Sequence, residues 1–169
     1  MTTYRDAGFL AEAFRNFLAL LGWSASEEKE IYSLDELVAK FSLDGIHRSN
    51  AVFNFHPDDP RKWTDDKAIW MNAEYIRTMP LNELLPHVKA ELKATKLWRE
   101  EYEENDRDWY ERTIDLIRQR FFTLKDFSSQ GRAYFSEDFD FDTAAIEKNL
   151  NKFPDLKLWL PELADRFEA

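Results

Sequence analysis

The chain has 169 residues, no cysteine and a formal net charge of −10. The lack of cysteine excludes disulfides, thiolate chemistry and cysteine-based zinc sites, and it favours a cytoplasmic protein. The negative charge argues against a general nucleic-acid binder, but it allows a local basic patch because salt screens charges beyond roughly 10 Å.

The composition is typical of a folded, helical protein. Hydrophobic residues make up 44% of the chain and aromatic residues 15%, which is enough for a sizeable core. Only four glycines and six prolines interrupt the sequence, and this scarcity favours helices over sheets. The sequence has no apolar run long enough to cross a membrane. Its length suits one large domain or two small ones.

The first helix is predicted between residues 9 and 22. Its apolar residues repeat at helical spacing: Leu10, Phe14, Phe17, Leu18 and Leu21. Gly22 supplies a C-terminal stop, while Arg15 and Asn16 are expected to face solvent. The pattern therefore predicts a helix that buries one face.

A second helix and an extended segment follow. Ser33 and Glu36 have the spacing of a capping box, and the helix they begin is predicted to end near Phe41. Residues 44–53 are expected to be extended, with one or two short strands. Residues 54–66 contain prolines and are predicted to form a surface loop.

Helices alone are predicted beyond this loop. Residues 67–77 form one helix, Pro80 fits the first turn of the next, and Pro86 is expected to kink or divide it. The fold class is therefore mainly α, with a small α/β element in the first third followed by an α-helical bundle. We place a domain boundary near residues 78–80, which divides the chain into 1–78 and 79–169.

The helix that begins near Asp108 has the clearest pattern. Its core stripe consists of residues that share one face: Tyr110, Ile114, Ile117 and Phe121. Thr113 and Leu116 are expected to widen this stripe. Thr123, with Asp126 three residues later, is predicted to cap the next helix.

Charge is distributed unevenly around this helix. Residues 100–111 contain seven acids and one base, whereas residues 112–132 contain five bases and two acids. The basic segment includes the junction between the two helices, residues 118–126, which we call the corner. Its cations Arg118, Arg120 and Lys125 form either a binding surface or a solvated group that complements a helix C-terminus.

Two further helices are predicted near the C-terminus. Tyr134 and Phe135 are expected to pack inward, and Asp142 is predicted to cap a helix over residues 143–150. The last helix is amphipathic, with an apolar stripe of Leu156, Trp159, Leu160, Leu163 and Phe167.

The sequence contains no pattern that indicates catalysis or a metal site. His47, His56 and His87 are far apart in the chain, and no carboxylate spacing around them resembles a set of metal ligands. The acids of residues 100–104 are typical of a solvated face rather than of a catalytic pair. A phosphate-binding glycine loop and a nucleophile elbow are both missing. The chain is therefore not expected to be catalytic by itself.

Several stretches, in the same order, resemble bacterial glutamyl-tRNA synthetases. Residues 4–23 (YRDAGFLAEAFRNFLALLGW) resemble the segment after the KMSKS-type loop, and residues 70–77 (WMNAEYIR) resemble a second specific motif. Less specific matches are residues 30–37 (EIYSLDEL), 51–53 (AVF) and 120–127 (RFFTLKDF). Together the matches cover nearly the whole chain.

The resemblance implies part of a longer ligase. In that family a catalytic Rossmann domain lies upstream and carries the sites for ATP, Mg²⁺, glutamate and the tRNA acceptor end. The chain is therefore expected to hold no cofactor. It would comprise a stem-contact fold (1–78) and the first of two helical anticodon-binding domains (79–169). The implied function is tRNA binding and anticodon recognition in translation, with aminoacylation performed by the missing domain.

The resemblance also implies particular tRNA-binding residues. Arg120 matches the family's arginine before Phe-x-Thr-Leu-Lys, which helps to read the third anticodon base, and Arg118 matches a neighbouring basic position. Lys67 and Arg77 flank the motifs of the stem-contact fold, where similar proteins touch the inner side of the tRNA. An arginine plane can hydrogen-bond or stack on a splayed base, whereas Lys125 would contact phosphate as a point charge.

The expected partner is glutamate-specific tRNA, bound by a monomer that does not engage DNA or membrane. Trp70, Met71 and Tyr75 are expected in the core rather than on RNA. The chain departs from the family pattern in the longer link of residues 54–66 and in Phe122, where a polar residue is common. The alternative function is a helical protein-interaction or scaffold module without RNA binding, and a stand-alone enzyme is a weaker alternative.

Overall fold

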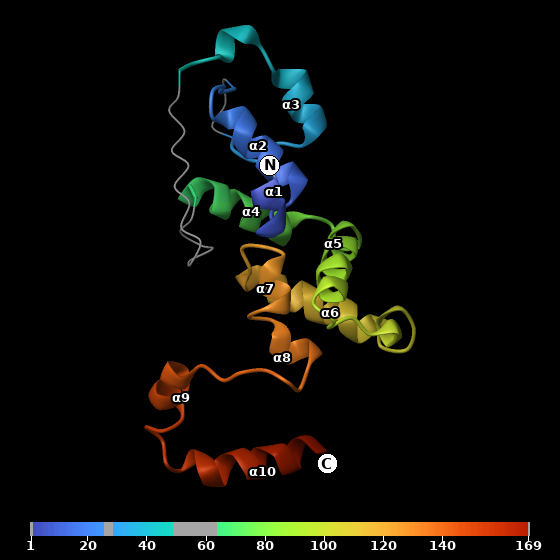
Figure 1. The fold of residues 1–169 in the computed structure, drawn as a ribbon, viewed down its shortest axis with the longest axis vertical. Helices are drawn as coiled ribbons and strands as arrows, with labels where there is room; N and C mark the ends of the chain where they lie inside the picture. Colours follow the sequence, from blue (N-terminus) through green and yellow to red (C-terminus); the bar gives the residue numbers. More distant parts are fainter. Residues whose placement is uncertain (1, 26–28, 49–63, 169) are drawn as a thin grey trace. The chain divides into compact units, whose positions relative to one another are not determined.

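The computed structural model describes residues 2–25, 29–48 and 64–168 (Figure 1). The chain divides into two compact units, Met1–Ser136 and Glu137–Ala169. Unit 1 continues across residues 78–80. The division of the chain into domains 1–78 and 79–169 remains a prediction.

Helices make up almost all regular structure in the described residues, which confirms the mainly α class. Unit 1 contains α1 (Thr2–Asp6), α2 (Ala11–Leu20), α3 (Leu34–Lys40), η1 (Leu43–Gly45), α4 (Asp66–Thr78), α5 (Leu81–Ala94), η2 (Glu100–Glu103), α6 (Arg107–Ile117), η3 (Arg118–Arg120), α7 (Lys125–Ser128) and α8 (Arg132–Phe135). Unit 2 contains α9 (Thr143–Asn149) and α10 (Leu156–Glu168). Across these described ranges the only bridge of β type joins Trp23 and Ile46. Of the segment 44–53 that was predicted to be extended, residues 44 and 45 belong to η1 instead, because Ser42 caps a short helical turn there. Residues 49–53 of that segment and residues 54–63 of the predicted loop lie outside the described residues.

The main core of unit 1 is shared by helices from both sides of residue 78. Its buried side chains are Leu10, Ala13, Ile76, Leu84, Val88, Leu92, Leu97, Tyr102, Tyr110, Ile114, Ile117, Phe121, Phe127 and Phe135. The stripe predicted for α6 is therefore confirmed. Thr113 is also buried, but Leu116 is 70% exposed. On a helical wheel Leu116 lies roughly 130° from the centre of the stripe and Thr113 only about 70°, so the prediction for Leu116 was wrong.

Helix α2 forms as predicted, with two corrections, the first of which is that Leu18, predicted on the buried face, is 36% exposed. Leu10 and Phe17 are buried, but Asn16, expected in solvent, is fully buried. Its Oδ1 accepts hydrogen bonds from the Tyr32 amide at 2.7 Å and from the Tyr75 hydroxyl at 2.9 Å. A buried amide is tolerated when it is hydrogen-bonded, so Asn16 links α2 to two other segments.

Two predicted helix caps are confirmed. The Glu36 amide donates to Ser33 Oγ at 3.2 Å and the Ser33 amide donates to Glu36 Oε2 at 2.9 Å, which is a complete capping box. Asp142 Oδ1 accepts from the Ala145 amide at 3.0 Å. By contrast, Pro86 does not divide α5, which is continuous. The proline lies in the second turn, where it removes only one intrahelical hydrogen bond.

Some aromatic side chains differ from expectation. Met71 is fully buried and Tyr75 half-buried, but Trp70 is exposed at 40% rather than in the core. Phe135 is buried as predicted, whereas Tyr134 is exposed. Adjacent residues on a helix point in different directions, so each pair cannot share one core face. Within the described ranges, no helix is both long and apolar enough to cross a bilayer.

Candidate functional site

The corner is a tight turn built around one carboxylate. Asp126 Oδ2 accepts from the amides of Phe122 at 2.8 Å and Thr123 at 2.9 Å, while Asp126 Oδ1 accepts from Gln130 Nε2 at 2.9 Å. The acidic half of the predicted capping box is thereby confirmed. Helix α7 begins at Lys125 with Leu124 as its N-cap residue, so Thr123 is not the N-cap that was predicted.

Two segments that are distant in the sequence fix the backbone of the corner. The Gly8 carbonyl accepts from the Leu124 amide at 2.8 Å. Asn72, fully buried on α4, donates from Nδ2 to the Phe122 carbonyl at 2.6 Å and accepts at Oδ1 from the Leu10 amide at 2.8 Å. Figure 1 shows α7 beside α1 and α4, as these bonds require. The backbone of the corner therefore has two anchors from separate parts of unit 1, the Gly8 carbonyl and the Asn72 side chain.

Gly8 permits this close approach. Its φ is +85°, a conformation that side-chain-bearing residues rarely adopt. A Cβ at this position would lie 2.8 Å from the backbone nitrogen of Lys125, closer than real Cβ contacts, and 3.0 Å from the backbone nitrogen of Leu124. Only glycine fits where the N-terminal segment meets the corner.

Arg120 is an exposed cation of the corner. It is the last residue of η3, and within the described parts of the chain its side chain has no hydrogen-bond or ion-pair partner. The next residue, Phe121, is buried against Phe127, with ring centroids 4.9 Å apart and planes at 85°. An exposed guanidinium thus extends from a fixed backbone, an arrangement suited to an anionic or planar partner.

Arg118 points inward instead. Its side chain is 14% exposed. Nη1 donates to the Met79 carbonyl at 2.7 Å, and Nη2 lies 2.7 Å from Asp115 Oδ1. The guanidinium therefore joins the end of α6 to the junction between α4 and α5, so the structure gives Arg118 a positioning role in unit 1.

Lys125 is half exposed and paired with Glu91 of α5. Its Nζ lies 2.9 Å from Glu91 Oε2, and the side chains are 46% and 9% exposed, respectively. Glu91 therefore contacts the corner, although no local sequence pattern marks it. Asn72, the other residue missed, lies within the WMN motif, which could have indicated it.

Lys67 and Arg77 lie at opposite ends of α4, about 15 Å apart along the helix axis. Lys67 Nζ lies 2.6 Å from Glu30 Oε1, and Arg77 forms an ion pair with Glu74. Their charges are partly neutralised within unit 1, and the structure does not bring the two side chains together.

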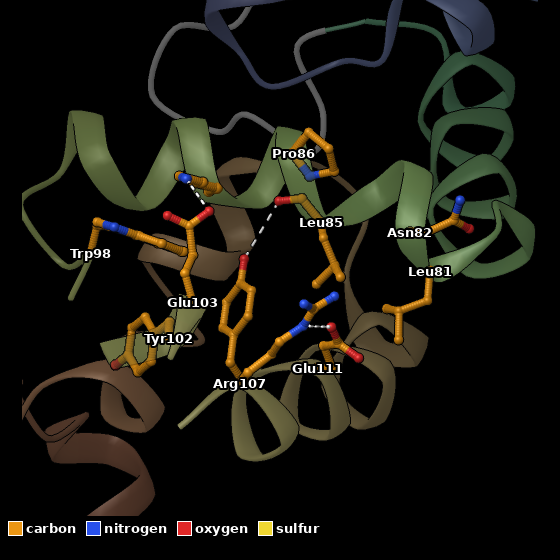
Figure 2. A pocket seen from close by; sticks show the side chains of 11 residues that line it. Leu81, Asn82, Leu85, Pro86, Trp98, Tyr102, Glu103, Arg107 and Glu111 are labelled. Atoms are coloured by element: carbon orange, nitrogen blue, oxygen red, sulfur yellow. Dashed lines mark hydrogen bonds and ion pairs between the residues drawn. The ribbon is translucent and has the colours of Figure 1, made fainter. Parts of the chain in front are cut away.

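A cavity of about 790 Å³ lies between α5 and α6 (Figure 2). Trp98, Tyr102 and Tyr110 form part of its wall, together with the Lys89–Glu103 and Arg107–Glu111 ion pairs. Tyr102 and Tyr110 stack with ring centroids 5.2 Å apart. The aromatic faces in this wall are therefore largely engaged with one another.

The chemistry of this cavity is limited. The Tyr110 hydroxyl donates to the Leu85 carbonyl over 3.5 Å, and burial raises the pKa of Tyr110 well above its ordinary value. The hydroxyl is therefore neutral near pH 7 and cannot serve as a base. In the parts of the chain that the structure covers, no group of three or more His, Asp or Glu side chains could hold a metal ion.

The chain is similar to known proteins over nearly its whole length. Residues 80–169 match the family model described as the anticodon binding domain. The chain is 51% identical to a glutamate–tRNA ligase of Desulfotalea psychrophila over 166 residues, which are 98% of this chain and 34% of that protein. It is 33% identical to the glutamate–tRNA ligase of Thermus thermophilus over 98% of this chain and 32% of that protein.

A solved structure is also similar over the same extent. A glutamate–tRNA ligase from Elizabethkingia meningosepticum, crystallised with its amino acid, matches with a TM-score of 0.72 and 28% identity over 98% of this chain and 30% of that one. The chain thus spans about a third of the length of the relatives it matches. With more than half of its residues matched by the family model, the chain belongs to the family of anticodon-binding domains of glutamate–tRNA ligases.

Proposed function

We propose that this chain binds the anticodon arm of glutamate tRNA as part of a glutamate–tRNA ligase, and that Arg120 reads the third anticodon base. The main support is the exposed Arg120 guanidinium, which has no partner among the described residues and lies on a corner whose backbone is fixed by Gly8, Asn72 and Asp126. Recognition of a splayed base requires such a donor at a defined position. Aminoacylation, with ATP and Mg²⁺, then belongs to parts of the enzyme outside this segment.

The cations around Arg120 have different roles in this proposal. Arg118 holds the corner in position through the Met79 carbonyl. Lys67 and Arg77 contribute at most weak backbone contacts along α4, because each already has an acidic partner. The net charge of −10 keeps sequence-independent RNA binding low, so recognition concentrates at Arg120.

Titration of isotope-labelled protein with the anticodon stem-loop of glutamate tRNA tests the proposal by NMR. Amide shifts are expected to cluster in residues 118–126 and to weaken when the third anticodon base is changed. Arg120→Lys keeps the charge but loses the planar fork, so it should reduce discrimination between the two loops on the order of 10-fold.

Arg112→Lys is the matched control. Arg112 is exposed on α6 and pairs with Asp108, so the same substitution there should leave discrimination unchanged. Equal effects of the two substitutions, or shifts that ignore the changed base, would refute base reading by Arg120.

A further inference from the structure

One buried carboxylate holds both ends of α7. Glu91 Oε2 accepts from Lys125 Nζ at 2.9 Å, and Glu91 Oε1 accepts from Ser128 Oγ at 2.5 Å. Lys125 and Ser128 are the first and last residues of this helix. Because both carboxylate oxygens are engaged and Glu91 is almost fully buried, water cannot easily replace either partner.

Lys125 lies between Glu91 and solvent. Its Cγ is 3.1 Å from the position that a Cβ on Gly8 would occupy, so the aliphatic stem runs against the N-terminal segment. Almost half of the side chain remains exposed. An ammonium has three donors, and the structure assigns one of them to Glu91. The charge is thus close to the RNA-facing corner but already compensated.

We propose that Glu91 competes with the RNA backbone for the Lys125 ammonium. By holding this ammonium, Glu91 limits the sequence-independent affinity for RNA at the corner. This inference rests on the proposed function, since it assigns a role within the same site. Phosphate contacts add affinity without reading sequence, so a free lysine beside Arg120 would strengthen binding to any RNA. A buried carboxylate that lost its cation would be strongly destabilised, and Glu91 therefore competes effectively with a phosphate.

Glu91→Gln removes the competing charge while keeping a group of similar shape that can hydrogen-bond Ser128. One additional phosphate contact on a single strand steepens the slope of log K against log salt by about 0.7. With equal RNA affinity of the two proteins at 1 M salt, this steeper slope makes the Glu91→Gln variant bind roughly 8-fold more tightly at 50 mM salt. Affinity should rise equally for the cognate loop, the changed loop and an oligouridylate of the same length. A second change, Lys125→Gln, should abolish the gain.

Glu83→Gln is the matched control. It makes the same change in charge on α5, but Glu83 is exposed. Circular dichroism and the amide spectrum establish that each variant is folded. Equal effects of Glu91→Gln and Glu83→Gln, or weaker binding by a folded Glu91→Gln protein, would overturn the proposal.

A measurement on Lys125→Gln alone keeps the test independent of Glu91 variants. If Glu91 holds the lysine, this substitution changes RNA affinity less than about 2-fold and leaves the salt slope unchanged. A several-fold loss with a shallower slope would show that Lys125 already binds phosphate, against the proposal. The oligouridylate slope tests this inference, whereas the ratio between the two stem-loops tests base reading by Arg120, so the two can fail separately.

Discussion

Replacing Asn72 by alanine removes both side-chain hydrogen bonds that join α4 to the start of α2 and to the corner. The Leu10 amide is buried and would be left without its acceptor, at a cost of about 2 kcal/mol. The half-buried Phe122 carbonyl can reach water, so its loss costs about 1 kcal/mol. Alanine's better helix propensity offsets roughly 0.5 kcal/mol. We therefore expect the free energy of unfolding to fall by about 2.5 kcal/mol.

Urea denaturation followed by far-UV circular dichroism measures this change. Asn82→Ala is the control, because Asn82 is an exposed asparagine in the first turn of α5. Its substitution should change the free energy of unfolding by less than about 0.5 kcal/mol. The reasoning fails if Asn72→Ala costs less than about 1 kcal/mol, or no more than the control.

Three further predictions concern single side chains. Gly8→Ala should lower the free energy of unfolding by about 2 kcal/mol or more, because Gly8 has a positive φ and close backbone contacts. Gly22→Ala should lower it much less, because the nearest atom to a Cβ at Gly22 is 3.7 Å away. Similar losses in the two variants would contradict this prediction. Tyr110→Phe should remove a tyrosine that ionises at higher pH than an ordinary tyrosine in an ultraviolet titration. Because burial raises the pKa of Tyr110 above 10, its stabilising effect is complete below pH 10 and declines at higher pH, so the variant should lose less stability there. The hydrogen bond from Lys29 lowers the pKa of Glu36 below 4.5, and Lys29→Met should raise that carboxyl's NMR titration midpoint; an unchanged midpoint would exclude this cause.

Features decided by neighbouring residues were predictable from the sequence. The α6 stripe follows from residues three or four apart on one face, and both caps join groups three residues apart. These local patterns were sufficient to predict the mainly α class and the order of the helices. The family resemblance then identified Arg120, whose exposure agrees with its proposed role.

Features decided by distant pairing were not predictable. Asn16 was placed in solvent because an asparagine on a helix is usually exposed, but its partners Tyr32 and Tyr75 come from other segments. Arg118 and Lys125 resemble RNA-binding residues by position alone. Their partners, the Met79 carbonyl and Glu91, lie near the junction of α4 and α5 and on α5, and no spacing rule links them to the corner.

The anchors of the corner also determine whether the anticodon-binding segment can be separated from the rest of the chain. The family match begins at residue 80, yet the turn that carries Arg120 is fastened to Gly8 and Asn72. A recombinant segment starting at residue 80 would keep every matched position and lose both anchors. We expect it to retain helices but to present Arg120 in many orientations. An exchange of anticodon-reading modules between ligases would therefore have to transfer the N-terminal segment and α4 together with the corner.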